Sequence, residues 1–296
     1  MTRIAFFGSP PFAATVLEAL VASGHQVTVA ITRADRRRSR GGAPVGTAVK
    51  EAAERLGVPT SFEPDAAAGS SAELGVVVAY GRLIRRPLLD RLILVNLHLS
   101  LLPRWRGAAP VERAILAGDA VTGVCLMRID EGLDTGPVYG CAEVPVGEDS
   151  AAELTERLVA AGIPLLLDRL AGGLDTLGQP EPQRGEPTYA AKLEPDERRL
   201  DWTRPAEQLA RVVRVGRAWT TREGARLLVH SARAHPDRGP RGEPGSVSLT
   251  AGGVVEVATG GGVLELVQVQ VEGRPPRLAA DWARGARLDG SSVLGR

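Results

Sequence analysis

Hydrophobic positions in the first part of the chain alternate between short apolar runs and longer segments with helical spacing. Residues 3–7 predict a strand, 11–22 predict a helix with one apolar stripe, and 26–32 predict a second strand. A strand, a helix and a strand within about 30 residues form a βαβ unit, whose two strands are parallel. We therefore expect the chain to begin with an open, Rossmann-like, mostly parallel α/β sheet.

The same alternation continues beyond this first unit. Pro110 suits the first turn of a helix, and Ser150 with Glu153 forms a capping box at the start of a long one. The further helices are predicted at 46–56, 110–117 and 150–170, and the further strands at 58–62, 75–79, 93–97, 123–129 and 137–144.

Composition changes after the last of these helices. Residues 178–187 are rich in Pro, Gly, Gln and Glu and show no periodicity, which is typical of an interdomain linker. A helix follows at 205–215, and then short strands separated by Gly-rich turns, at 226–232, 245–249, 254–258 and 263–271. We expect an α/β domain over 1–177, a linker over 178–199, and a small C-terminal, OB-like β-barrel domain over 200–296.

Composition and charge favour a folded protein of the cytoplasm. The 296 residues are 44% hydrophobic and carry a net charge of +1, so the overall charge does not call for a polyanionic partner. Cys125 and Cys141 are too few for a disulfide framework or a cysteine-based zinc site. No apolar run approaches the ~20 residues of a membrane helix, and the start MTRIAFFG lacks the features of a secretory signal. We expect a cytoplasmic location and no membrane contact.

The first strand-to-helix turn reads GSPPF and does not match the dinucleotide-binding pattern GxGxxG. Pro10 and Pro11 also remove two backbone donors that a pyrophosphate would need. A nicotinamide or flavin site is therefore disfavoured.

Asn96 and His98 are the first candidates for chemistry. They lie two residues apart near the end of an apolar strand, so their side chains share one face. Ligands of open α/β sheets bind at the carboxyl ends of the strands, where this segment opens into a loop. An asparagine can donate to a developing oxyanion, and an imidazole can accept or donate a proton near neutral pH. The alternative is a hydrogen-bonded core histidine.

The stretch DEGLDTG at 130–136 is the second candidate. A calcium site of the EF-hand type is excluded, because the third and twelfth positions counted from Asp130 are Gly132 and Cys141. In the functional interpretation, Asp134 is the carboxylate that orients His98 and favours its protonated form. This requires two loops to meet, and we expect both to leave the sheet at the same edge. The alternative is a loop that merely needs glycine.

Two further stretches complete the candidates. AYGRLI at 79–84 follows a buried strand and could form a wall of the same crevice. RADRRRSRGG at 33–42 is either a solvated loop or a grip for nucleic-acid phosphates. Its arginines are Arg33, Arg36, Arg37, Arg38 and Arg40.

Several stretches together resemble the bacterial methionyl-tRNA formyltransferases, a family of formyltetrahydrofolate-dependent transferases. They span nearly the whole chain, and SLLPRWRGAAP is the most specific of them. The stretches are FFGSPPFA (6–13), VVVAYGRLI (76–84), VNLHLSLLPRWRGAAPVERAILAGD (95–119), TGVCLMRIDEGLDTG (122–136), TYAAKL (188–193), LDW (200–202) and ADWARGARL (280–288).

The resemblance implies an enzyme that transfers a formyl group from 10-formyltetrahydrofolate to the amino group of methionyl initiator tRNA, without a metal. Asn96, His98 and Asp134 would be catalytic, and the arginine run would bind the tRNA with help from the C-terminal domain. The tetrahydrofolate would be held by Ser100, Leu101, Leu102, Pro103, Ala79, Tyr80, Gly81, Leu83, Ile84, Asp130 and Gly132. We expect a monomer that takes part in translation initiation.

The chain also departs from the family pattern. The segment 58–74 is shorter than usual, so one crossover helix is expected to be truncated or missing, and VGRAWT replaces the usual stretch at 215–220. The alternatives therefore stay open. One is an N-formyltransferase for a small amine such as an amino sugar nucleotide. The other is a tRNA- or nucleotide-binding protein without activity.

Overall fold

The computed structural model describes residues 1–37, 44–288 and 291–295, and its contacts divide the chain into two compact units. We call them the N-terminal unit, comprising Met1–Val111, Ala120–Val146 and Glu153–Ala191, and the C-terminal unit, comprising Glu112–Asp119, Gly147–Ala152 and Lys192–Arg296. Two predicted phosphate-binding residues, Arg38 and Arg40, lie outside the described residues.

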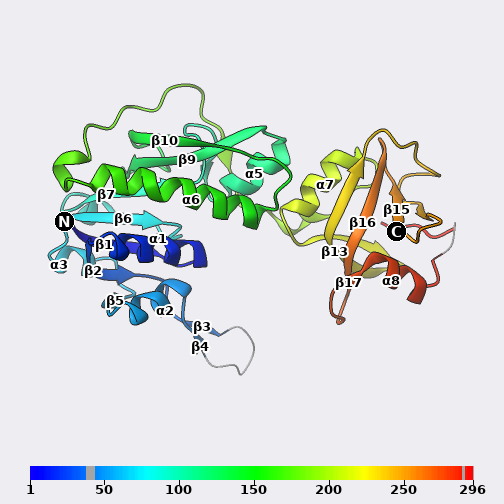
Figure 1. Ribbon diagram of the computed structural model, residues 1–296, viewed down its shortest axis with the longest axis horizontal. Helices are drawn as coiled ribbons and strands as arrows, with labels where there is room; N and C mark the ends of the chain where they lie inside the picture. The colour runs from blue at the N-terminus through cyan, green and yellow to red at the C-terminus, as the bar shows by residue number, and fades with distance from the viewer. Residues whose placement is uncertain (38–43, 289–290, 296) are drawn as a thin grey trace. The chain divides into compact units, whose positions relative to one another are not determined.

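A seven-stranded sheet forms the N-terminal unit, in the order β10-β9-β7-β6-β1-β2-β5 (Figure 1). From β5 to β7 all neighbours are parallel, whereas β9 runs antiparallel to β7 and β10 antiparallel to β9. The mostly parallel sheet predicted from the sequence is confirmed. Its strands are β1 (Arg3–Gly8), β2 (Gln26–Ile31), β5 (Thr60–Ser61), β6 (Leu74–Val78), β7 (Ile93–His98), β9 (Val121–Arg128) and β10 (Val138–Pro145).

Helices connect these strands much as the hydrophobic spacing predicts. In α1, the buried residues recur at helical spacing, from Ala13 through Val16 and Leu17 to Leu20. The crossover from β5 to β6 carries only the four-residue helix α3, in agreement with the short segment seen in the sequence. The helices are α1 (Pro11–Ala22), α2 (Ala48–Arg55), α3 (Ala66–Gly69), α4 (Arg86–Leu89), α5 (Pro110–Ala117) and α6 (Ala151–Leu170), with a 3₁₀ turn at Leu174–Thr176.

The two faces of β7 have different neighbours. Leu97 faces α6, because a Cβ atom at Gly162 of that helix would lie 3.0 Å from the Val124 side chain and 3.4 Å from Leu97. Asn96 and His98 alternate with Leu97 and therefore point to the opposite face. On that face lies a buried cluster that includes Phe7, whose ring meets Tyr80 edge-on at 5.5 Å between centroids.

Short pairings attach loops to this unit. β3 (Arg36–Arg37) pairs with β4 (Pro44–Val45), and β8 (Arg106–Gly107) pairs in parallel with β11 (Tyr189–Ala190). The second pairing means that residues as far along the chain as Ala191 belong to the N-terminal unit. A disulfide links Cys125 of β9 to Cys141 of β10, a single bridge to which the sequence had assigned no role.

The C-terminal unit is built on an antiparallel sheet in the order β12-β13-β16-β15-β14, with β17 on β16. Of the OB-like β-barrel domain expected from the sequence, the C-terminal β domain is confirmed as an antiparallel sheet, and the path of its described strands ends at β12 and β14. Trp202, Leu209 and Trp282 are buried in its core. The elements are β12 (Ala218–Arg222), β13 (Ala225–His235), β14 (Val247–Leu249), β15 (Val255–Ala258), β16 (Val263–Val271), β17 (Arg277–Leu278), α7 (Ala206–Arg214) and α8 (Ala279–Gly285), with a 3₁₀ turn at Pro195–Arg198.

Within the described residues, none of the helices combines the length and the apolar character needed to cross a bilayer.

Candidate active site

His98 is buried at the end of β7, with 6% of its surface exposed. Its Nε2 atom lies 2.9 Å from the carbonyl oxygen of Trp105, a hydrogen-bond distance at which the ring nitrogen must be the donor. Its Nδ1 atom lies 3.7 Å from Oδ2 of Asp134, which is too long for a hydrogen bond. Nε2 is therefore anchored, and Nδ1 is the nitrogen left for chemistry.

Asp134 is held by the loop that follows β7. The backbone N–H of Gly107 donates to its Oδ2 atom at 2.8 Å, so the oxygen that faces His98 is fixed in place. Because both nitrogens of His98 face acceptor oxygens, only a doubly protonated ring could donate to Trp105 and Asp134 together. The two loops predicted from the sequence to meet do so at this carboxylate.

The expectation that the two loops leave the sheet at the same edge is wrong, however. β9 is antiparallel to β7, with His98 opposite Cys125 and Val95 opposite Arg128. The loop after β9 therefore leaves the sheet beside the start of β7, whereas the loop after His98 leaves from its other end. Asp134 reaches His98 because the loops at 130–136 and 99–109 come together from opposite ends of the strand.

Asn96 lies two residues before His98 in β7, so the two side chains are on the same face of the strand. Its side chain is half-buried, and within the described part of the chain its amide makes no hydrogen bond. An accessible amide that has no partner among the described residues is available to a ligand oxygen.

The stretch after His98 folds into a tight loop. The buried hydroxyl of Ser100 donates to the carbonyl of Arg104 at 2.6 Å, and Pro103 is buried after a cis peptide bond with Leu102. Trp105 has a left-handed φ of 62°, which is unusual for a bulky residue. Ser100 and Pro103 thus help to shape the loop that carries the Trp105 carbonyl.

In the stretch 79–84, the side chains of Ala79, Arg82 and Leu83 are exposed, whereas those of Tyr80 and Ile84 are buried. Tyr80 and Ile84 are buried in the cluster beneath the loop, and burial raises the pKa of Tyr80 although nearby Arg82 opposes this. Leu83 is 80% exposed. In the other predicted folate-binding stretch, Asp130 accepts from the Gly132 N–H at 3.0 Å and from the Thr135 hydroxyl at 2.7 Å, which closes the turn.

Residues 181–190, which we call the strap, cross the loops around His98. Thr188 accepts from the Trp105 N–H through its hydroxyl at 2.8 Å, and from the Arg106 N–H through its carbonyl at 2.9 Å. Gln183 donates to the carbonyls of Asp134 and Gly136 at 2.8 Å each and accepts from Arg106. No sequence pattern pointed to Gln183, and Thr188 stood out only as part of the family motif TYAAKL.

With this geometry in view, comparisons with known proteins identify the family. The formyl transferase model matches residues 2–170, and the formyl transferase C-terminal domain model matches 192–287. The chain is 42% identical to the methionyl-tRNA formyltransferase of Thiobacillus denitrificans over 308 residues, with 99% of each chain covered. The chain belongs to the methionyl-tRNA formyltransferase family. Another relative in this family, from Halorhodospira halophila, is 44% identical with 97% of each chain covered.

Solved structures share the fold at lower identity. The methionyl-tRNA formyltransferase from Clostridium thermocellum superposes with a TM-score of 0.60 at 15% identity, covering 80% of this chain and 96% of that one. An N-formyltransferase from Helicobacter canadensis, in complex with folinic acid and dTDP-3-aminofucose, gives 0.69 at 13%, covering 90% and 99%. HypX from Aquifex aeolicus, in complex with tetrahydrofolic acid, gives 0.68 at 18%, covering 95% and 47%. At these identities the likeness concerns the fold alone.

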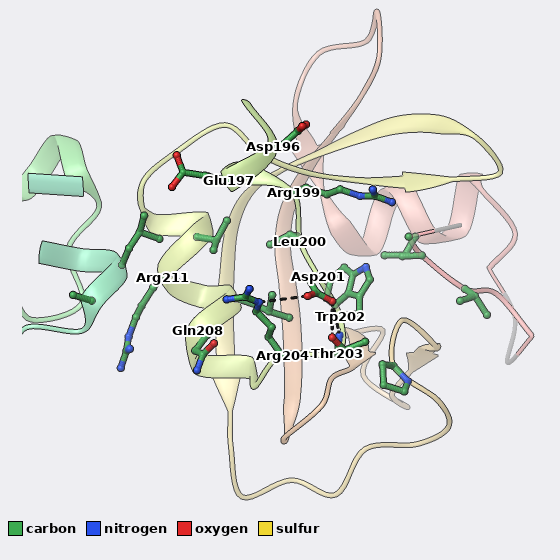
Figure 2. A pocket seen from close by; sticks show the side chains of 18 of the residues that line it. Asp196, Glu197, Arg199, Leu200, Asp201, Trp202, Thr203, Arg204, Gln208 and Arg211 are labelled. Atoms are coloured by element: carbon green, nitrogen blue, oxygen red, sulfur yellow. Dashed lines mark hydrogen bonds and ion pairs between the residues drawn. The ribbon is translucent and has the colours of Figure 1, made fainter. Parts of the chain in front are cut away.

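Within the described residues, two cavities are not lined by Asn96, His98 or Asp134. One of about 990 Å³ is in the C-terminal unit, and none of the predicted site residues lines it. Figure 2 shows its charged lining, in which Asp201 pairs with Arg204 at 3.4 Å. Glu197 pairs there with Arg113 at 2.6 Å. A second cavity, of about 340 Å³, borders Ile93 at the start of β7, and Asp130 is the one predicted folate-binding residue in its lining.

Of the predicted tRNA-binding arginines, Arg33 has a described side chain, and it contacts the 79–84 loop. Its Nε atom donates to the Tyr80 carbonyl at 3.3 Å. A Cβ atom at Gly81 would lie 2.3 Å from its guanidinium, so the loop and the arginine are closely packed. No group of three or more His, Cys, Asp or Glu residues in the described ranges is arranged to hold a metal ion.

Proposed function

We propose that this enzyme transfers the formyl group of 10-formyltetrahydrofolate to the free amino group of methionyl initiator tRNA, giving the N-formylated tRNA that starts translation. The family assignment supports this reaction, since relatives above 40% identity across nearly the whole chain carry the name methionyl-tRNA formyltransferase. The sugar N-formyltransferase resembles the chain only in fold, at 13% identity.

One observation carries the mechanism. Asn96, whose amide has no hydrogen bond within the described residues, shares a face of β7 with His98. The Nδ1 atom of His98 lies 3.7 Å from Oδ2 of Asp134. This arrangement supplies a neutral donor, an imidazole and a fixed carboxylate within one cluster. These are the groups that acyl transfer needs, because charge develops on the carbonyl oxygen while protons leave the amine.

The reaction then proceeds through a tetrahedral intermediate. Attack by the methionyl nitrogen on the formyl carbon forms a C–N bond and places negative charge on the formyl oxygen. Asn96 and the protonated Nδ1 of His98 would donate to this oxygen. Collapse breaks the bond to N10 of the folate, the amine gives up one proton, and N10 receives one. Asp134 orients His98 and assists this proton transfer, with a water molecule as the relay.

The folate is assigned to the two loops beside these residues. The exposed Leu83 and the backbone of Ala79 and Gly81 lie next to the carboxyl end of β6, which pairs with β7 through Val77 and Asn96. We propose that the pterin binds against 79–84 and 130–132, and that Ser100–Pro103 contribute mainly backbone and the half-buried Leu101 and Leu102. No step of this mechanism requires a metal.

The tRNA is assigned to the arginine run and the C-terminal domain. Arg33 already hydrogen-bonds the Tyr80 carbonyl, so we propose that Arg36, Arg37, Arg38 and Arg40 make the phosphate contacts. We further propose a catalytic domain over 1–177, a connecting segment over 178–199 whose residues up to Ala191 pack with that domain, and a tRNA-holding domain over 200–296. The enzyme would act as a monomer in the cytoplasm, where initiator tRNA is charged.

An acceptor comparison tests the function. The purified enzyme is mixed with 10-formyltetrahydrofolate and, in separate reactions, methionyl initiator tRNA, uncharged initiator tRNA or dTDP-3-aminofucose, and tetrahydrofolate release is followed. Release only with the charged tRNA is the expected result. Turnover with the amino sugar and none with methionyl-tRNA would overturn the proposal in favour of a small-amine acceptor.

A further inference from the structure

We propose that the strap, residues 181–190, is a positioning device for His98, in which Thr188 fixes the anchoring carbonyl and Gln183 fixes the carboxylate loop. The proposal rests on the proposed formyl transfer, because it concerns the residues assigned to that chemistry. Within the described residues, neither Thr188 nor Gln183 hydrogen-bonds His98 itself. Each acts through a residue that contacts His98.

The first arm of the strap acts on the side of Nε2. The Thr188 hydroxyl accepts the Trp105 N–H at 2.8 Å, and Nε2 of His98 lies 2.9 Å from the Trp105 carbonyl. The peptide groups on both sides of the Trp105 α-carbon are thus engaged. Because a hydrogen bond to one ring nitrogen selects the tautomer, this arm keeps the proton on Nε2 and leaves Nδ1 for the reaction.

The second arm acts on the side of Nδ1. The Gln183 amide donates to the carbonyls of Asp134 and Gly136, which holds the backbone at Asp134 and two residues after it. The oxygen of the same side chain accepts two bonds from Arg106, at 3.0 and 2.7 Å. Gln183 therefore ties the loop after β9 to the loop after β7, although these leave the strand at opposite ends.

Both residues that contact His98 have backbones that need support. Trp105 has a φ of 62° and Asp134 a φ of 51°, and such left-handed conformations are unfavourable for non-glycine residues. Strained residues of this kind persist where surrounding contacts over-determine them. The two strap side chains supply these contacts, one for each strained residue.

The burial pattern of the strap agrees with this role. Gln183 and Thr188 are half-buried and Ala190 is buried, whereas the rest of the strap is exposed. These three residues face the active-site loops that they contact. The sequence of the strap is polar and aperiodic, which is why the composition alone suggested a linker.

Steady-state kinetics of matched variants test the proposal. Thr188→Val removes the hydroxyl acceptor but keeps the shape, Thr188→Ser keeps the hydroxyl, and Gln183→Leu removes the amide. We expect Val and Leu to lower kcat by about tenfold or more, with KM for the folate changed less than about twofold, because small displacements of reacting groups are costly. Thr188→Ser is expected to stay near the wild type. Glu186→Gln, an exposed change in the same strap, is the control.

A second readout does not depend on activity. The chain has four histidines, so ¹⁵N-labelled imidazole signals can be assigned to His98 by comparison with His98→Ala. At a pH where the ring is neutral, the wild type is expected to show the proton on Nε2, and Thr188→Val is expected to show a mixture of tautomers. This readout separates the two proposals, since an enzyme inactive on methionyl-tRNA would still report its tautomer.

The kinetic and NMR results together either support or overturn the proposal that the strap positions His98. Folded variants with lowered kcat and altered His98 signals support it. Variants that lose activity only in proportion to a lowered melting temperature, with unchanged His98 signals, would show that the strap is merely structural. Unchanged kcat in both Thr188→Val and Gln183→Leu would overturn the proposal while leaving the formyl transfer intact.

Discussion

At the scale of single residues, the proposed chemistry follows from which polar groups of Asn96, His98 and Asp134 already have hydrogen-bond partners in the protein. Nε2 of His98 is bound to the Trp105 carbonyl and Oδ2 of Asp134 to the Gly107 N–H. Within the described residues, no hydrogen bond engages the Asn96 amide or Nδ1 of His98, and both residues lie on the same face of β7. These two groups are accordingly assigned to the formyl oxygen and to proton transfer.

Replacing His98 should separate catalysis from folding. His98→Ala is expected to lower kcat by roughly a hundredfold or more, in line with the usual contribution of general acid–base groups. Circular dichroism and thermal unfolding serve as the control for the fold. A His98→Ala enzyme with near-normal turnover would remove His98 from the mechanism.

Asn96→Ala tests the oxyanion donor. Loss of one such donor typically lowers kcat by about 10²–10³-fold. Since the amide has no hydrogen bond within the described residues, its removal breaks no hydrogen bond of the protein, and the free energy of unfolding should change little. Parallel measurement of kcat and urea unfolding checks both statements. A large loss of stability with normal kcat would contradict the assignment.

At the scale of elements, the hydrophobic periodicity of the sequence predicted the positions of the strands. It did not predict strand direction or loop contacts, which depend on pairing between distant segments. The apolar run at Leu74–Val78 and the alternation at Ile93–His98 place their strands correctly, because buried parallel strands and same-face residues follow from local pattern. The direction of β9 is set by distant contacts, so the meeting of the loops was expected for the wrong geometric reason. The strap was missed because its hydrogen bonds leave no periodic signal.

The β8–β11 pairing depends on Gly107, which offers a prediction of stability. Its φ is 122°, and a Cβ atom there would lie 2.8 Å from the Ala190 carbonyl oxygen. Gly107→Ala should lower the free energy of unfolding by about 1–3 kcal/mol and reduce activity, because strain of this size accompanies such backbone positions. Gly147→Ala is the control, with a positive φ of 55° and no atom within 4 Å. Equal losses in urea unfolding would show that the close approach to Ala190 is unimportant.

The arginine run carries a prediction about salt. Replacing Arg36, Arg37 and Arg38 together by Gln should weaken binding of initiator tRNA, and the slope of log affinity against log salt should become shallower. Filter binding or fluorescence anisotropy at several salt concentrations measures the slope. An unchanged slope would mean that these arginines are only a solvated surface.

At the scale of the whole molecule, each unit has its own core and its own electrostatic balance. In the C-terminal unit, Glu265 is 14% exposed and accepts from Arg233 at 2.9 Å and from His235 at 2.8 Å. Burial raises the pKa of Glu265, but the hydrogen bonds from His235 and Arg233 outweigh it and hold the pKa below its usual value. The charged form is therefore favoured by folding.

This shift has a definite sign for stability. A carboxyl whose pKa is lowered in the folded state stabilises the fold above its ordinary pKa, and the contribution is lost as the pH falls through the folded value. Glu265→Gln should lower the unfolding free energy at pH 7 by about 1 kcal/mol, and the difference should shrink below the ordinary value of 4.5. Tryptophan fluorescence follows this unit through the buried Trp202 and Trp282. A difference independent of pH would contradict the assignment.

The site formed by Asn96, His98 and Asp134 is proposed to transfer a formyl group to methionyl-tRNA. The most direct measurement is a single-turnover reaction with enzyme in excess over methionyl initiator tRNA and 10-formyltetrahydrofolate, after which the tRNA ester is hydrolysed and the released amino acid is identified by mass spectrometry. We predict N-formylmethionine from the wild type, formed at a rate at least about a hundredfold lower in His98→Ala. Unmodified methionine from a folded wild-type enzyme would contradict the account.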